Sequence, residues 1–282
     1  MSNKSMQLNT SKISFIGAGN MASAIIEGLI ENGVEPGSIL ASDPSPEKLD
    51  AMQTRLGIGV TTDNAIAVSS ADIVVLAVKP QVMAQVIEPL KALFEEKTPV
   101  VVSIAAGIEM QSLQSWLGGA VPIVRCMPNT PAQVLEGASG LFANAQVGEE
   151  QKQVIEAMFA AVGYATWVEK ESLIHAVTAV SGSGPAYFFL MISEMAKAGE
   201  ALGLEAESAK RLAAQTALGA AKMVLESDLP AEQLKRNVMS PGGTTERAIH
   251  VFENDGLPEL VSKAMTACAD RSKEMAELLS DK

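Results

Sequence analysis

Near the start of the chain, a short run of small residues has the spacing of a phosphate-binding turn. Gly17, Gly19 and Ala22 stand at G-x-G-x-x-A spacing, directly after the apolar run 12–16 and directly before the amphipathic stretch 22–32. The first glycine permits a tight turn, the second lets the backbone approach a pyrophosphate, and the small third residue lets helix and strand pack closely. Free N–H groups at the helix N-terminus then receive the phosphate. The run predicts a dinucleotide site; the alternative is a tight turn in an unrelated sheet protein.

The choice between NAD and NADP depends on residues at the end of the second expected strand, 39–42. An acid such as Asp43 bonds the ribose 2′-hydroxyl of NAD, whereas a 2′-phosphate favours a cation or hydroxyl groups. Ser42, Ser45 and Lys48 offer those groups. Asp43 followed by proline is also an ordinary turn pair. From these residues alone, both cofactors remain open.

Two further loops follow the carboxyl ends of expected strands. Parallel α/β sheets bind their ligands at these ends. Ala77-Val78-Lys79-Pro80 carries a lone cation that reaches phosphate or ribose, or is simply a solvated lysine. The other loop, Ser103-Ile104-Ala105-Ala106-Gly107, contains small residues that leave room for a flat ring.

Two breaks rich in Gly, Ser and Thr interrupt the second half of the chain. They are Ser181-Gly182-Ser183-Gly184-Pro185 and Ser240-Pro241-Gly242-Gly243-Thr244-Thr245. Each is expected to precede a helix, and so to offer free N–H groups, hydroxyls and the positive end of a helix dipole. That chemistry suits a small carboxylate. The alternative is a pair of linkers with helix caps.

The chain offers no strong candidate for acid–base chemistry. His175 and His250 lie in helical stretches, no Cys/His cluster has metal-ligand spacing, and no G-x-S-x-G elbow is present. Hydride transfer to an already protonated C=N group fits this inventory, because positioning and water exclusion then carry the catalysis.

Apolar runs and helical stretches alternate over the first part of the chain. Strands are expected at 12–16, 39–42, 73–78, 99–105, 121–127, 140–143 and 166–168, and helices at 22–32, 46–56 and 82–94. This order predicts an α/β fold, an N-terminal Rossmann domain with a doubly wound parallel sheet. From residue 172 onward the stretches 172–180, 185–202, 205–226, 230–239, 244–254 and 258–279 are all helical. We therefore expect domains at 1–169 and 170–282, the second all-α.

Composition narrows the class of protein. A length of 282 residues favours two domains, and 48% hydrophobic residues suffice for real cores. A net charge of −12 disfavours nucleic acid and anionic membranes as partners. Cys126 and Cys268 are expected to be reduced thiols. Residues 1–11 lack the apolar region of a signal peptide, and no uninterrupted apolar run approaches the roughly 18 residues of a membrane span, so a cytoplasmic protein is expected.

Six motifs together carry a family resemblance. They are F-I-G-A-G-N-M-A at 15–22, A-V-K-P at 77–80, V-S-I-A-A-G at 102–107, R-C-M-P-N-T-P at 125–131, A-V-S-G-S-G-P-A-Y at 179–187 and S-P-G-G-T-T at 240–245. In this order, across nearly the whole chain, they closely resemble the Δ1-pyrroline-5-carboxylate reductase family. The last two motifs distinguish that family from other Rossmann reductases.

The resemblance implies reduction of pyrroline-5-carboxylate by NAD(P)H to L-proline, the last step of proline biosynthesis. It implies a preference for NADP(H), with NAD(H) also possible, although Asp43 stands where many relatives carry serine, threonine or a basic pair. It also implies that the helical domain is a dimerisation domain interlocking two chains, and that homodimers assemble further, commonly into decamers.

The resemblance also implies which residues of this chain bind the cofactor and the substrate, position by position. Cofactor-binding residues are Gly17, Ala18, Gly19, Asn20, Met21, Ala22, Ser42, Asp43, Asn64, Ala77, Val78, Lys79, Pro80, Ala105, Ala106 and Gly107. Substrate-binding residues are Ser240, Pro241, Gly242, Gly243, Thr244 and Thr245, with Asp228 and Asn237 nearby. A hydroxyl of Thr245, Ser181 or Ser183 is the candidate contact to the ring nitrogen. No metal is expected.

Two alternatives remain at this stage. A β-hydroxyacid dehydrogenase needs a catalytic lysine in the first interdomain helix, and the stretch 172–202 offers only Lys197. A non-catalytic nucleotide-sensing protein is the other alternative, and the intact Gly-Gly-Thr-Thr loop argues against it.

Overall fold

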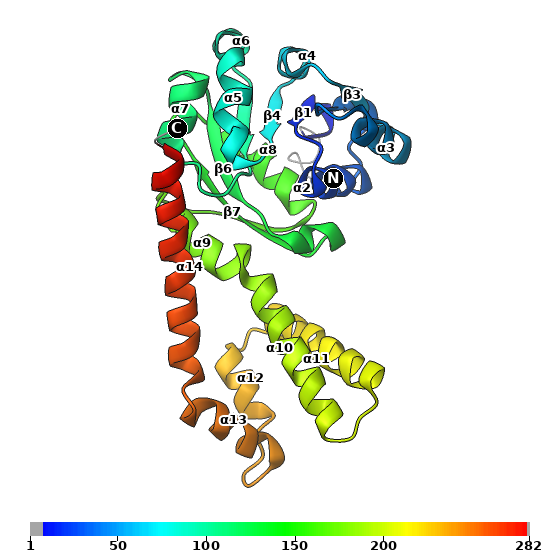
Figure 1. Ribbon diagram of the computed structural model, residues 1–282, viewed down its shortest axis with the longest axis vertical. Coiled ribbons are helices and arrows are strands. Elements are labelled where there is room, and N and C mark those ends of the chain that lie inside the picture. The colour runs from blue at the N-terminus through cyan, green and yellow to red at the C-terminus, as the bar shows by residue number, and fades with distance from the viewer. Residues whose placement is uncertain (1–7, 281–282) are drawn as a thin grey trace. The chain divides into compact units, whose positions relative to one another are not determined.

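The computed structural model describes residues 8–280, which form two compact units (Figure 1). One unit comprises the described residues up to Gly182 and those from Cys268 onward; the other is Ser183–Ala267. The first unit extends past the predicted boundary at 169 because helix α9 (Leu173–Val177) packs on the sheet and the end of the last helix returns to it. Part of the stretch considered for a signal peptide, residues 1–7, lies outside the described residues.

In the described part of the chain, the first unit holds an eight-stranded sheet in the order β3-β2-β1-β4-β5-β6-β7-β8. The strands are β1 (Ile13–Ile16), β2 (Ile39–Ser42), β3 (Gly59–Thr61), β4 (Ile73–Leu76), β5 (Val100–Ser103), β6 (Ile123–Met127), β7 (Gly137–Ala143) and β8 (Gly163–Trp167). The predicted Rossmann architecture is confirmed, with one antiparallel step between β6 and β7. The link 128–136 is too short for the crossover that a parallel neighbour requires.

Helices cover both faces of this sheet. One face carries α2 (Asn20–Glu31), α3 (Pro46–Leu56) and α8 (Glu149–Ala160), whose apolar residues join one core cluster. The other carries α4 (Asn64–Ser69), α5 (Met83–Ile87), α6 (Lys91–Lys97) and α7 (Met110–Leu117), which join a second cluster. Strand side chains alternate between the two clusters, as Ile73 and Val75 do against Val74 and Leu76. Burial on both faces explains why these strands are continuously apolar.

Several elements of the first unit differ from the expectation. The expected helix 82–94 is divided into η2 (Pro80–Val82), α5, η3 (Glu88–Leu90) and α6, because Pro89 supplies no N–H group to a continuous helix. The short strand β3 and helices α4, α7 and α8 have no counterpart among the expected elements. Short 3-10 segments η1 (Pro36–Ser38) and η4 (Thr130–Val134) complete the connections.

The second unit is helical, as predicted. It contains α10 (Gly184–Ala201), α11 (Ala206–Glu226), α12 (Ala231–Asn237), α13 (Thr244–Asn254) and the first part of α14 (Leu257–Ser280). Helices α10 and α11 form a packed hairpin. Large apolar side chains along α10 are nevertheless exposed, including Phe188, Phe189 and Leu190.

The expected break at 181–185 is not an open loop. The chain runs from α9 through a π-helical turn, η5 (Thr178–Gly182), directly into α10. By length and composition alone, the joined stretch Leu173–Ala201 would suffice to cross a membrane, and only 17% of its most apolar window is buried. Much of the apolar surface of α10 is therefore exposed in the described part of the chain.

Candidate functional site

Three loops meet at the carboxyl ends of β1, β2 and β4. The N–H of Gly17 donates to the carbonyl oxygen of Ser42 at 2.7 Å, and that of Ala77 donates to Ile16 at 2.8 Å. Gly17 has φ +106°, and a Cβ there would lie 2.6 Å from the carbonyl oxygen of Ala77. Only glycine fits both the left-handed backbone and this approach.

Gly19 serves a different purpose. Its backbone is ordinary, with φ −83° and ψ 178°, and a Cβ there would meet nothing within 4 Å. It is the N-cap of α2, without a side-chain cap, so the first N–H groups of the helix face the same open space. Behind them, Ala22 is fully buried. Open space beside an uncapped helix N-terminus fits a phosphate group.

Asp43 is held beside this turn and is almost fully buried. One oxygen, Oδ2, accepts the N–H of Ala18 at 3.0 Å, and the other, Oδ1, accepts the N–H of Ser45 at 3.0 Å. The Nζ of Lys48, an exposed side chain, lies 3.8 Å from Oδ1. The carboxylate thus fixes the geometry of two turns and has a cation next to it.

Ser42 and Asn64, both predicted to bind the cofactor, are in contact with each other. The Ser42 hydroxyl, fully buried, donates to Oδ1 of Asn64 at 2.6 Å. Ser42 therefore acts on this region by holding Asn64, the first residue of α4.

The remaining cofactor candidates lie in the loops that follow β4 and β5. Lys79 is exposed at the start of η2. The loop after β5 turns at Gly107, which is buried with φ +77°. A Cβ on Gly107 would lie 3.1 Å from Leu279, since the end of α14 packs against this turn.

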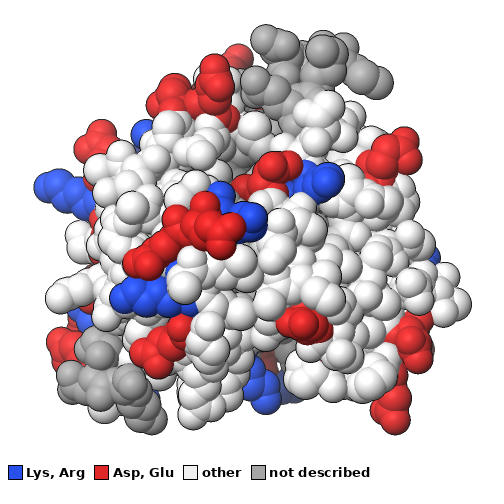
Figure 2. Space-filling view, turned by 90° about the horizontal axis from the view of Figure 1, so that it is seen from above, with Lys and Arg blue, Asp and Glu red and all other residues white. Residues whose placement is uncertain are grey.

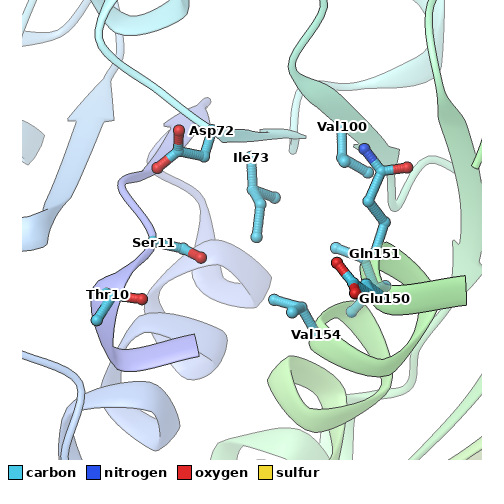
Figure 3. A pocket seen from close by; sticks show the side chains of 9 residues that line it. Thr10, Ser11, Asp72, Ile73, Val100, Glu150, Gln151 and Val154 are labelled. Atoms are coloured by element: carbon cyan, nitrogen blue, oxygen red, sulfur yellow. The ribbon is translucent and has the colours of Figure 1, made fainter. Parts of the chain in front are cut away.

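A hollow of about 280 Å³ lies at the opposite edge of the sheet (Figure 3). Asp72, Ile73 and Val100 line it, at the amino ends of β4 and β5, together with Val154 of α8. The loops described above leave the carboxyl ends of the strands, so this hollow is not the dinucleotide site.

Acidic and basic side chains are interspersed on the face shown in Figure 2. This face carries no broad basic area among its described residues. Binding of an anionic ligand in a chain of net charge −12 then depends on local N–H groups and single cations.

The second unit holds the Gly-Gly-Thr-Thr loop. Gly243 is the N-cap of α13 and has no side chain to cap it, so N–H groups of the first turn, including those of Thr244 and Thr245, are available. The N–H of Gly243 is used within the loop, donating to Ser240 at 2.8 Å. The N–H of Gly242 donates to Oε2 of Glu246 at 2.7 Å.

Glu246 contacts the expected substrate loop and was not among the residues predicted from the sequence. One N–H group of the loop expected to hold a carboxylate therefore already donates to a carboxylate of the chain itself. The available signal was its position in the first turn of a helix, where glutamate reaches back to free N–H groups.

The other substrate candidates are placed as follows. Ser181 lies in the π-helical turn, where its hydroxyl donates to Val177 and its carbonyl accepts from Asn129. Ser183 is the N-cap of α10 in the second unit. Asp228 and Asn237 are exposed near α12, and Asn237 accepts a hydrogen bond from Gln233.

Lys197, on which the dehydrogenase alternative depended, is exposed and paired with Glu194 at 2.7 Å.

Groups with perturbed titration do not form a nucleophilic centre. Burial raises the pKa of the Cys126 thiol well above its usual value, which keeps it protonated. Burial also lowers the pKa of His175, and its Nδ1 lies 2.9 Å from the Ser272 hydroxyl. Among the residues described, no group of three or more His, Cys, Asp or Glu side chains could hold a metal ion.

Gly19 gives a direct test of the phosphate site. Gly19→Val should leave the Tm nearly unchanged, because the backbone is ordinary and the side chain meets open space. It should weaken NAD(P)H binding about a hundredfold by occupying the phosphate position. Fluorescence titration with NADPH measures the Kd. Gly37→Val is the matched control, since a Cβ there also meets nothing within 4 Å. Equal affinities for the two variants would refute this site.

Two family models match the chain. "Pyrroline-5-carboxylate reductase dimerisation" matches residues 171–275, and "NADP oxidoreductase coenzyme F420-dependent" matches residues 12–107. The first indicates that the helical part of the chain serves self-association. The second covers the loops that converge around Gly17.

Relatives match over nearly the full length. A pyrroline-5-carboxylate reductase from Pseudomonas aeruginosa is 51% identical, with 96% of this chain and 99% of the relative covered. The solved enzyme from Coxiella burnetii is 47% identical, with a TM-score of 0.92, covering 95% of this chain and 99% of the other. A Plasmodium falciparum pyrroline carboxylate reductase, solved with NADP bound, is 32% identical, with a TM-score of 0.84 and the same coverage. The predicted resemblance is confirmed: the chain belongs to the pyrroline-5-carboxylate reductase family, and it is an oligomeric oxidoreductase that uses a nicotinamide cofactor.

Proposed function

We propose that the chain reduces Δ1-pyrroline-5-carboxylate to L-proline with NAD(P)H, the last step of proline biosynthesis. The observation that carries this proposal is the open phosphate position at Gly19 in a chain 51% identical to a pyrroline-5-carboxylate reductase. The helical unit adds an uncapped helix N-terminus at Gly243, suited to a small carboxylate.

Reduction of a protonated C=N bond needs little acid–base catalysis from the protein. When bound, NAD(P)H supplies the hydride. The carbon of the protonated C=N bond accepts it, and the π pair becomes the lone pair of the ring nitrogen. The side chains then orient the substrate and exclude water, which suits a site without a nucleophilic centre.

We assign roles to the chain's own residues as follows. The turn Gly17–Ala22 binds the pyrophosphate, with Asp43 and Asn64 near the adenosine ribose and residues 77–80 and 105–107 near the nicotinamide half. The loop 240–245 holds the substrate carboxylate through the N–H groups of the α13 N-terminus. The hydroxyl of Thr245, or that of Ser181 or Ser183, contacts the ring nitrogen, and Asp228 and Asn237 line the site.

We infer that NADPH is the preferred cofactor and that NADH is also used. Asp43 already accepts two N–H groups, and Lys48 beside it offers a cation to a 2′-phosphate. A relative solved with NADP bound supports the same choice.

We further propose that two chains form a homodimer through the helical unit, and that dimers assemble into a decamer. A second copy would cover the exposed apolar side chains of α10, because residues 171–275 match a dimerisation model. On this proposal, the apolar stretch Leu173–Ala201 lies in a protein interface instead of a membrane. We also propose that the protein is cytoplasmic.

An assay of the purified protein tests the reaction. Oxidation of NADPH, and more slowly of NADH, should follow addition of pyrroline-5-carboxylate and yield proline. Absorbance at the nicotinamide band measures the rate, and amino-acid analysis identifies the product. No turnover with either cofactor would reject the proposed reaction.

The charges near the adenosine ribose should determine the preference between NADPH and NADH. Asp43→Asn should raise the ratio of kcat/KM for NADPH over NADH severalfold, because one negative charge near the 2′-phosphate is removed. Lys48→Ala should lower the same ratio, since a cation is lost. Steady-state kinetics with both cofactors measure the change, and thermal melts verify folding. Shifts in the same direction for the two variants would contradict this account of the preference.

Thr245 should affect substrate turnover more than cofactor binding. In Thr245→Ala we expect kcat/KM for pyrroline-5-carboxylate to fall about tenfold to a hundredfold, as when a charge-assisted hydrogen bond is lost. The Kd for NADPH should change less than about twofold. Thr216→Ala, an exposed position within α11, is the matched control. A comparable loss of NADPH affinity in Thr245→Ala would refute the assignment.

A further inference from the structure

Glu171 joins three segments that lie far apart in the sequence. Its Oε1 accepts the N–H of Met110 at 2.6 Å, and the same oxygen forms an ion pair with the guanidinium of Arg125. The Arg125 side chain is 4% exposed and that of Glu171 28% exposed. An ion pair this sheltered from water is held in one geometry and weakly screened.

The Arg125 end of this pair lies beside the start of the loop that flanks the nicotinamide half. Arg125 is paired in the sheet with Ser103, the last residue of β5. The loop 104–109 leaves the sheet directly after Ser103. Glu171 therefore contacts the strand next to the point where this loop begins.

The Met110 end lies where the same loop finishes. Met110 is the first residue of α7, and the N-cap residue, Glu109, makes no side-chain cap. The carboxylate of Glu171 takes that place from a distant position in the chain. Loop 104–109 is thus held at both ends through one carboxylate.

A second set of contacts holds the middle of the loop. The last turns of α14 pack on Gly107 through Met275 and Leu279. Helix α14 is in turn tied to α9 by the contact between His175 and Ser272. The Glu171 carboxylate adds a further connection, because Glu171 lies just before α9 and contacts Met110 at the end of the loop.

We propose that Glu171 is a positioning residue for the nicotinamide half of the cofactor, acting through Arg125 and the N-terminus of α7. This inference rests on the proposed function, because it assumes that loop 104–109 flanks the nicotinamide. Glu171 does not touch the cofactor; it fixes the loop that does. A displaced loop would misplace the hydride donor relative to the C=N carbon, and a shift of about 1 Å can lower the rate roughly a hundredfold.

Comparison of two ligands tests the proposal without reference to turnover. NADPH carries the nicotinamide, whereas 2′-phospho-ADP-ribose keeps the adenosine and phosphate groups and lacks that ring. In Glu171→Ala, the Kd for NADPH should rise about tenfold while the Kd for the ring-free ligand changes less than about twofold. Isothermal titration calorimetry measures both constants, at a temperature well below the Tm of the variant.

Glu171→Ala leaves the Arg125 guanidinium buried without its partner, so a milder variant accompanies it. Glu171→Gln keeps an oxygen acceptor for the Met110 N–H and loses the charge. It should give the same selective effect, smaller in size, and kcat should fall in both variants more than KM for pyrroline-5-carboxylate rises. Glu205→Ala is the matched control, because Glu205 caps α11 through the N–H groups of Glu207 and Ser208 in the other unit.

The outcomes separate the possibilities. Selective loss of NADPH affinity in the Glu171 variants, absent in Glu205→Ala, supports the positioning role. Equal loss for both ligands, or a lower Tm with unchanged constants, overturns it in favour of a purely structural role. A wild-type chain that binds NADPH but does not reduce pyrroline-5-carboxylate contradicts the proposed reaction, and the ligand comparison still decides the role of Glu171.

Discussion

The contact between the Gly17 turn and the end of β4 constrains everything around the cofactor site. A Cβ at Gly17 would overlap the carbonyl of Ala77, so the two loops come as close as backbone allows. The N–H of Gly17 also bonds the end of β2. The ends of β1, β2 and β4 are therefore held close together, and the N-terminus of α2 has a fixed position beside them. Asp43 strengthens the same junction through the N–H of Ala18.

This construction also explains how a chain with net charge −12 can hold an anionic cofactor. In the proposed site, the attraction comes from uncapped N–H groups and a helix dipole, which act within a few ångströms and do not depend on the overall field. Single cations such as Lys48 and Lys79 add local charge. The loop before α13 in the helical unit also ends at a helix N-terminus without a side-chain cap, and Glu246 contacts one of the loop's N–H groups.

Much of the fold follows from local patterns. Continuous apolar runs identified β1, β2, β4, β5 and β6, because strands buried on both faces have no polar side. Helix α13 begins and ends where glycine and the helical period predict. Strand β3 escaped prediction because three half-buried residues at a sheet edge leave no periodic signal. The 181–185 segment was expected as a break because of its Gly and Ser content, but it is helical, with Gly182 in close contact with Met127.

The sequence by itself determined the dinucleotide turn, the two-part architecture and the family, since each is written in residues that lie close together or in a fixed order. Only the tertiary structure decided what Asp43, Ser42, Glu171 and Arg125 do. Glu171 and Arg125 are 46 positions apart, and Asp43 and Ala18 are 25 apart. Contacts over such separations depend on strand order and on which face each helix covers. The spacing of neighbouring residues does not encode strand order or helix placement, because both arise only when the helices pack on the two faces of the sheet.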